Sequence, residues 1–228
     1  MRKIIDLTME LYDGFTTNPA VWPRVRLLDF IPHGSTLTAT RFIAPCKGWE
    51  AKIFYLPDHA GTHVDAPCHF YQGGETIEKT ALESVMGEAV LIDVSFKKLD
   101  ETVLPEHFTK AMQNKNLILK KGDIAIIRCW AGARDERSFR DCRGLSGQSA
   151  SWLIERGIKC VGIDLSSIDD KADWARPAHM NFLDHKIPVI ENLINLDQIQ
   201  KVRFDFIALP LRIQGGTASP VRAVAIID

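Results

Sequence analysis

Residues 59–70 read HAGTHVDAPCHF and contain three of the seven histidines in the 228-residue chain. A helix is disfavoured here by Gly61, by the β-branched residues Thr62 and Val64, and by Pro67. The stretch instead predicts that a strand, AKIFYLP at residues 51–57, runs into a glycine-assisted tight turn.

Two histidines and an aspartate converge in this predicted geometry. Gly61 lets the backbone fold back so that His59 approaches His63. His63 and Asp65 face the same side because they are two residues apart in an extended segment. Such a set suits Zn²⁺, Mn²⁺ or Fe²⁺, and the lack of a converging cysteine disfavours a closed structural zinc site. Spacing alone leaves two interpretations open, a metal site and a polar loop.

Composition and charge exclude several classes of function. The net charge is −1 and the sequence pI is about 6.7, so nothing drives the chain toward nucleic acid or an anionic membrane. The five cysteines stand singly, which predicts reduced thiols, and Cys68 is expected to pack. We find no signal peptide and no apolar run long enough to span a membrane, so the expected location is the cytoplasm.

Short apolar runs bounded by turn residues predict a strand-rich single domain over residues 1–228. The predicted strands are residues 3–7, 36–43, 52–56, 89–94, 123–129, 159–165, 188–190, 204–211 and 221–227. Helices are predicted at 105–113, at 146–156 with Ser146 as N-cap and Gly157 as stop, and at about 178–185. The intermixed elements indicate an α/β or α+β class.

Several segments together resemble the metal-dependent cyclase family, which includes bacterial kynurenine formamidase and isatin hydrolase. The pattern His59-x-Gly-Thr-His63-x-Asp65-x-Pro-x-His69 is similar to the family's signature. GDIAIIRCW (122–130), LSGQSASWLIERGIKCVGIDLSSID (145–169), AHMNFLDHKIPVIENLINLDQI (178–199) and LPLRIQGGTASPVRAVAI (209–226) resemble further family segments. The resemblance implies an α/β fold of the swivelling β/β/α type, with a central, partly barrel-like sheet flanked by helices.

The resemblance also implies roles for individual residues. One or two divalent metal ions, zinc or manganese, would be held by His59, His63, Asp65, His179 and Glu191, with Asp65 bridging the two ions. His69 would shuttle a proton rather than ligate. His33, His107 and His185 match no family position, and we expect them to face solvent.

The implied reaction is hydrolysis of a non-peptide C–N bond by metal-activated water, in an aryl formamide such as N-formylkynurenine or in a small cyclic amide. Two alternatives stay open: a metal-dependent cyclase or dehydratase acting on a carbonyl substrate, and a binding protein with an inactive site. Product mass distinguishes hydrolysis from dehydration. Every implied ligand and His69 are present, which argues against an inactive site.

Departures from the family pattern fall in loops. The closing family motif Gly-x-Asp-Gly-Ser-Pro reads GGTASP at residues 215–220, and AGARDERSFRDCRG at 131–144 is off-pattern. Trp22, Phe15 and Ser219 are implied substrate-binding residues, while Thr62 and Arg222 are candidates for orienting ligands or substrate. The resemblance further implies a homodimer or homotetramer, in which Trp22 or Phe15 reaches a neighbour's pocket.

Overall fold

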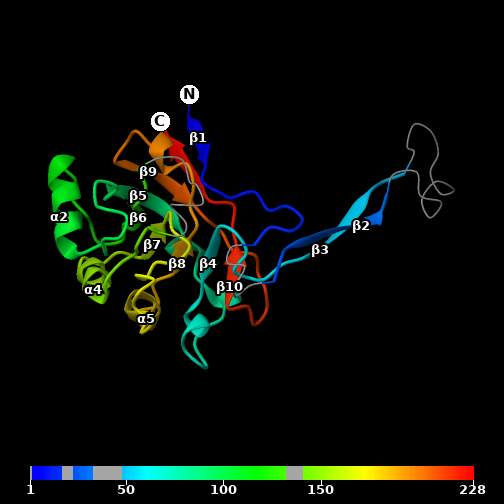
Figure 1. The fold of residues 1–228 in the computed structure, drawn as a ribbon. Coiled ribbons are helices and arrows are strands. Elements are labelled where there is room, and N and C mark those ends of the chain that lie inside the picture. Colours follow the sequence, from blue (N-terminus) through cyan, green and yellow to red (C-terminus); the bar gives the residue numbers. More distant parts are fainter. Residues whose placement is uncertain (1, 17–22, 33–47, 132–140) are drawn as a thin grey trace.

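The centre of the protein is a strongly curled sheet of nine strands, seen in a computed structural model that describes residues 2–16, 23–32, 48–131 and 141–228 (Figure 1). The strand order is β1-β11-β9-β5-β6-β7-β8-β4-β10. The strands are β1 (Lys3–Asp6), β4 (His63–Asp65), β5 (Met86–Asp93), β6 (Ile124–Arg128), β7 (Cys160–Ile163), β8 (Val189–Glu191), β9 (Arg203–Ile207), β10 (Ala218–Pro220) and β11 (Val224–Ile227). Neighbours from β5 to β8 are parallel, and the other neighbouring pairs are antiparallel.

Helices pack against one face of the parallel part of the sheet (Figure 1). The described residues form three α-helices, α2 (Pro105–Asn114), α4 (Gly147–Glu155) and α5 (Pro177–Asp184), and four 3₁₀ turns, η1 (Pro67–His69), η2 (Ile77–Lys79), η3 (Leu82–Ser84) and η4 (Leu196–Gln198). Phe108, Leu153 and Phe182, one from each α-helix, share a buried cluster with Val90 of β5. The next residue, Leu91, joins the cluster on the opposite face, as the two-residue period of a strand requires. Both faces are therefore covered, which explains the apolar runs Ala89–Ile92 in β5 and Ile124–Ile127 in β6.

A second, two-stranded sheet projects from the body of the protein (Figure 1). It pairs β2 (Arg26–Ile31) with β3 (Ala51–Tyr55) in antiparallel register. Its large side chains are uncovered: Phe30 is 60% exposed, Phe54 64% and Tyr55 61%. A two-stranded hairpin of this kind is only marginally stable by itself in water.

The mixed α/β class and most predicted elements are confirmed. All three predicted helices form, and Ser146 caps α4 by accepting a hydrogen bond of 3.1 Å from the Ser149 backbone N–H. Gly157 adopts a φ of +73° just after α4, which a residue with a side chain rarely adopts. The predicted strand at 36–43 lies outside the described residues.

Other sequence predictions are corrected. AKIFY forms β3 and is followed by the predicted bend at Gly61, but β3 pairs with β2 in the projecting hairpin, a pairing that was not predicted. β2, β4 and β10 were not predicted, and the strand expected at 204–211 ends at Ile207. β4 and β10 have only three residues each, too few for periodicity to identify. Within the described ranges we find no helix with the length and apolar character needed to cross a membrane.

Candidate metal centre

Strand β4 and the bend before it bring the histidines of residues 59–63 close to Asp65. Gly61 has a φ of +62°, and a Cβ there would lie 2.8 Å from Leu11 Cδ2, so a larger residue would be strained. β4 then pairs with β8 so that His63 stands opposite Glu191. Cross-strand partners place their side chains on the same face of a sheet, so these two groups meet although they are far apart in the chain.

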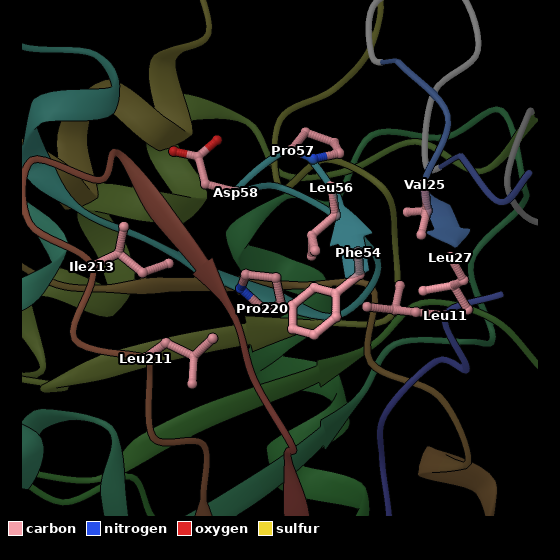
Figure 2. Close-up of a pocket in the computed structure, with 10 residues that line it drawn as sticks. All are labelled: Leu11, Val25, Leu27, Phe54, Leu56, Pro57, Asp58, Leu211, Ile213 and Pro220. Carbon is pink, nitrogen blue, oxygen red and sulfur yellow. The ribbon is translucent and has the colours of Figure 1, made fainter. Parts of the chain in front are cut away.

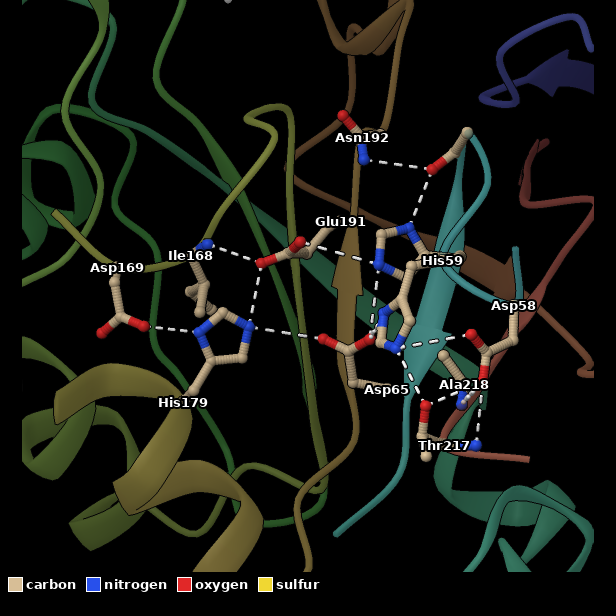
Figure 3. Close-up of polar contacts among 12 residues, drawn as sticks. Asp58, His59, Asp65, Ile168, Asp169, His179, Glu191, Asn192, Thr217 and Ala218 are labelled. Carbon is tan, nitrogen blue, oxygen red and sulfur yellow. Dashed lines mark hydrogen bonds and ion pairs between the residues drawn. The ribbon is translucent and has the colours of Figure 1, made fainter. Parts of the chain in front are cut away.

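Five predicted ligand side chains come together around Asp65 (Figure 3). Asp65 Oδ1 lies 2.9 Å from His59 Nδ1 and 3.3 Å from His63 Nε2, and Asp65 Oδ2 lies 3.3 Å from His179 Nε2. Glu191 adds Oε1 at 3.1 Å from His179 Nε2 and Oε2 at 3.7 Å from His63 Nε2. All five residues are buried.

The burial of the Asp65 carboxylate and the contacts of its oxygens indicate that this cluster suits a cation. Asp65 is 1% exposed, and neither of its oxygens accepts a hydrogen bond from the described protein. The imidazole nitrogens are near these oxygens but do not meet hydrogen-bonding geometry. A buried carboxylate is costly by several kcal/mol unless neighbouring positive charge compensates it. Imidazole nitrogens and carboxylate oxygens that converge in this way fit a divalent cation such as zinc or manganese.

The protons of two histidines are assigned by what the far side of each ring contacts. His63 Nδ1 lies 2.8 Å from the Gly61 carbonyl oxygen, and His179 Nδ1 lies 2.5 Å from Asp169 Oδ2. Both partners are acceptors, so each Nδ1 carries a proton and donates it. With Nδ1 donating, the Nε2 atom of each ring faces the carboxylate oxygens of Asp65 and Glu191. This is how metal-binding histidines are commonly oriented.

Backbone groups hold other parts of the centre. The Ile168 N–H donates to Glu191 Oε1 at 2.7 Å and orients that carboxylate. Asn192 donates through Nδ2 to the Gly61 carbonyl at 3.0 Å. The backbone carbonyl of Asn192 accepts a hydrogen bond from Thr62 Oγ1 at 2.7 Å. The Gly61 carbonyl that orients His63 is therefore itself fixed in place.

Electrostatics indicates that the cluster favours positive charge. Burial lowers the pKa of His63, but the neighbouring Asp65 and Glu191 carboxylates outweigh it and raise the pKa to about 9. Burial would also lower the pKa of His179, but Glu191, Asp169 and Asp65 outweigh it and raise that pKa well above its usual value. Burial would raise the pKa of Asp65, yet the charge of His63 holds it well below its usual range. Protons on the imidazoles thus balance the carboxylates, and a bound cation would displace them.

His69 lies in η1, directly after β4, and differs from the other histidines of the centre. Its ring centroid is 4.1 Å from that of His59 and 6.1 Å from that of His179. Burial is the main cause that lowers its pKa to about 4, so it is a neutral proton acceptor at pH 7. His59, Asp65 and His69 also offer ligand atoms within 4.8 Å of one another. The geometry thus suits His69 both as a base and as a ligand.

The remaining predicted residues lie apart from the ligand cluster. Phe15 packs with Val25 and Ala60 in a small core, and the Ser219 hydroxyl accepts a hydrogen bond from the Leu211 N–H at 2.9 Å. Arg222 pairs with Asp6 on the surface. Trp22 lies outside the described residues, so the three substrate-binding assignments stay predictions.

One expectation about the other histidines is wrong. His107 is buried, not solvent-facing, because its Nδ1 accepts a hydrogen bond from the Leu104 N–H at the start of α2 and its Nε2 lies 3.3 Å from Glu101. His185 is exposed as expected, and His33 lies outside the described residues.

An apolar cavity of about 510 Å³ adjoins the ligand-bearing bend (Figure 2). Its walls come from the base of the projecting hairpin and from the chain on either side of β10; they are Leu11, Val25, Leu27, Phe54, Leu56, Pro57, Asp58, Leu211, Ile213 and Pro220. Asp58 is the charged member of this wall, and it directly precedes His59 in the sequence. Sequence reasoning did not single out Asp58, Asp169 or Thr217, although the first two are acidic residues near predicted ligands.

Sequence comparisons find similar proteins over most of the chain. The family described as putative cyclase matches residues 5–170. Kynurenine formamidase of Bordetella pertussis is 32% identical over 171 residues, which are 74% of this chain and 77% of that protein. Kynurenine formamidase of Salinibacter ruber is 32% identical over 170 residues, covering 74% and 76%.

Solved structures are similar over nearly the whole chain. Isatin hydrolase A from Labrenzia aggregata, bound to benzyl benzoate, has a TM-score of 0.82 at 23% identity and covers 99% of this chain and 94% of that one. Isatin hydrolase A from Ralstonia solanacearum has a TM-score of 0.78 at 25% identity, with coverage of 100% and 92%. These similarities show that the fold is shared.

Proposed function

Because the chain belongs to the putative cyclase family, we propose that it is a metal-dependent hydrolase of a non-peptide C–N bond. Its curated relatives include kynurenine formamidases, and solved structures with the same fold include isatin hydrolases. An aryl formamide such as N-formylkynurenine, or a small cyclic amide, is therefore the proposed substrate class.

The observation that carries the proposal is the buried Asp65 carboxylate, whose two oxygens accept no hydrogen bond from the described residues while three imidazoles converge on them. We assign metal binding to His59, His63, Asp65, His179 and Glu191. Asp65 faces nitrogens through both of its oxygens, which supports a bridging role if two ions bind. Zinc and manganese both suit this donor set.

A divalent cation bound there would activate water and polarise the substrate carbonyl. The chain's own contribution centres on His69. Since its pKa of about 4 keeps it neutral, His69 accepts a proton from the attacking water and donates it to the leaving nitrogen. An amide nitrogen leaves poorly without that proton. Burial of the ligand cluster keeps bulk water away from the reacting groups.

The apolar cavity beside Asp58 supports an aromatic substrate. Its volume of about 510 Å³ exceeds that of a single benzene-sized ring, and nine of its ten lining residues are aliphatic, aromatic or proline. We place the aryl part of the substrate against this wall. Trp22, Phe15 and Ser219 remain proposed contributors to substrate binding.

Metal removal and isotope labelling test the reaction. We expect chelator-treated protein to lose turnover of N-formylkynurenine, other aryl formamides and isatin, and to regain it with Zn²⁺ or Mn²⁺. Hydrolysis in H₂¹⁸O should place one ¹⁸O in the acid product. Full activity in metal-free protein, or a product that has lost water, would contradict the proposal.

We also propose that the protein is a homodimer or homotetramer in which the projecting hairpin is covered by a second copy. The support is the exposure of Phe30, Phe54 and Tyr55 on a two-stranded sheet that has little stability alone. Light scattering of a Phe30→Ser, Tyr55→Ser variant should show a smaller particle. Ile118→Ser is the matched control because Ile118 is 73% exposed on the body of the protein. A wild-type monomer at all concentrations would refute this assembly.

Two finer assignments accompany the function. We propose that residues 1–228 form one domain, and that the curled sheet with its helices is of the swivelling β/β/α type. The continuous sheet order from β1 to β10 supports the first, and the similarity to isatin hydrolase structures supports the second. Limited proteolysis that released a stable fragment from within the nine-stranded sheet would contradict a single domain.

A further inference from the structure

The far side of the His59 ring is joined to Asp58 through the hydroxyl of Thr217 (Figure 3). His59 Nε2 lies 3.0 Å from Thr217 Oγ1, and Thr217 Oγ1 lies 2.7 Å from Asp58 Oδ2. Asp58 Oδ1 is 3.8 Å from His59 Nε2, too far for a direct hydrogen bond. The hydroxyl is therefore the link between the carboxylate and the imidazole.

Asp58 determines which atom is the donor in each of these two hydrogen bonds. Its Oδ2 also accepts the backbone N–H groups of Thr217 at 3.0 Å and Ala218 at 3.3 Å, so it is an acceptor held in place by backbone. A hydroxyl has one proton, and Thr217 donates it to this oxygen, which already accepts two backbone N–H groups. Thr217 Oγ1 must then accept from His59, which places the ring proton on Nε2.

We propose that Thr217 and Asp58 are positioning residues that hold His59 as its Nε2–H tautomer, so that His59 binds the metal through Nδ1. His63 and His179, whose Nδ1 atoms donate to Gly61 and Asp169, would bind through Nε2.

This inference rests on the proposed metal centre, and its first test identifies the ligating atom. In zinc-loaded protein with ¹⁵N-labelled histidine, we expect the His59 signals, assigned with His59→Gln, to show a protonated Nε2 and a zinc-bound Nδ1. His63 and His179 should show the opposite pattern. An unprotonated, zinc-bound Nε2 in His59 would overturn the inference. Failure of the wild-type protein to bind zinc at all would instead refute the metal centre.

The second test removes the hydroxyl. Thr217→Val keeps the side-chain shape but leaves the His59 Nε2–H without its acceptor, and we expect zinc affinity to fall about 10- to 100-fold in a competition titration with a chromophoric chelator. Thr217→Ser restores the hydroxyl and should restore the affinity. Thr102→Val is the matched control, because it also removes a threonine hydroxyl bonded to an aspartate, Asp170, but touches no ligand.

Three outcomes of the titration would overturn the inference. They are an unchanged zinc affinity in Thr217→Val, an equal loss in Thr217→Ser, and an equal loss in Thr102→Val. The second outcome would assign the effect to packing of the 215–220 loop, and the third to general destabilisation. Circular dichroism and the Tm of each variant establish that the folded protein is being compared.

Discussion

The metal-free protein should lose stability as the pH rises from 6 to 8.5. The reason is the His63 imidazolium, which Asp65 and Glu191 stabilise in the folded state with a pKa of about 9, against about 6.5 in the unfolded chain. A raised pKa gives stability that is complete below pH 6.5 and is lost as the pH rises toward 9. His179, whose pKa is also raised, acts in the same direction.

The size of the effect follows from the shift. At pH 6 the His63 proton contributes about 3 kcal/mol to the free energy of unfolding, and at pH 8.5 it contributes about 1 kcal/mol, by the linkage relation. The expected loss from His63 alone is therefore about 2 kcal/mol over this range. Urea unfolding of chelator-treated protein at several pH values measures it directly.

Two comparisons isolate the cause. Asp65→Asn removes the carboxylate that most strongly raises the His63 pKa, so its metal-free stability should depend much less on pH. Zinc-loaded wild-type protein should show the opposite slope between pH 5.5 and 7.5, because protons and zinc compete for the same imidazoles. A metal-free stability that is flat or increases from pH 6 to 8.5 would refute this account of the centre.

Three other changes have defined expected outcomes. His69→Ala should lower kcat by about 10²-fold or more at unchanged zinc content, whereas His185→Ala, at an exposed site, should leave both unchanged; loss of zinc would make His69 a ligand. Asp169→Asn weakens the acceptor that orients His179 and should reduce zinc affinity about 10-fold or more in a chelator competition. Ser146→Ala removes the α4 cap and should cost about 1 kcal/mol in urea unfolding without affecting zinc.

The parallel strands and the helices could be predicted from the sequence because local signals identify them. β5, β6 and β7 each contain an apolar run of four residues, and α4 has both a serine cap and a glycine stop. β4 and β10 have no such signal, since each has three residues and is stabilised by pairing with distant strands. The hairpin of β2 and β3 was only half predicted, because β2 combines apolar residues with Arg26 and Asp29.

The sequence predicted the proposed ligands of the candidate site but not the groups that orient those ligands. Histidine and carboxylate side chains are visible in a sequence, and family resemblance added His179 and Glu191 to the cluster around β4. The groups that orient them include the Gly61 carbonyl and the Ile168 N–H, which every residue possesses and no motif reveals. The register that places His63 opposite Glu191 likewise depends on the folded sheet.

The ligands and the apolar cavity come from different parts of the fold, and this separation bears on how the protein selects a substrate. The proposed ligands lie on β4, β8, α5 and the turn before Gly61, within the sheet and its helix layer. The cavity walls come mainly from the base of the hairpin and from residues 211–220. Changes in those walls can alter the accepted substrate without moving the metal ligands, as expected when loops on a fixed scaffold determine specificity. Asp58 is the exception, since it lines the cavity and is linked to His59 through the Thr217 hydroxyl. The proposed role of Thr217 would therefore restrict substitution there, whereas Leu211 and Ile213 line the cavity without a contact to the proposed ligands among the described residues.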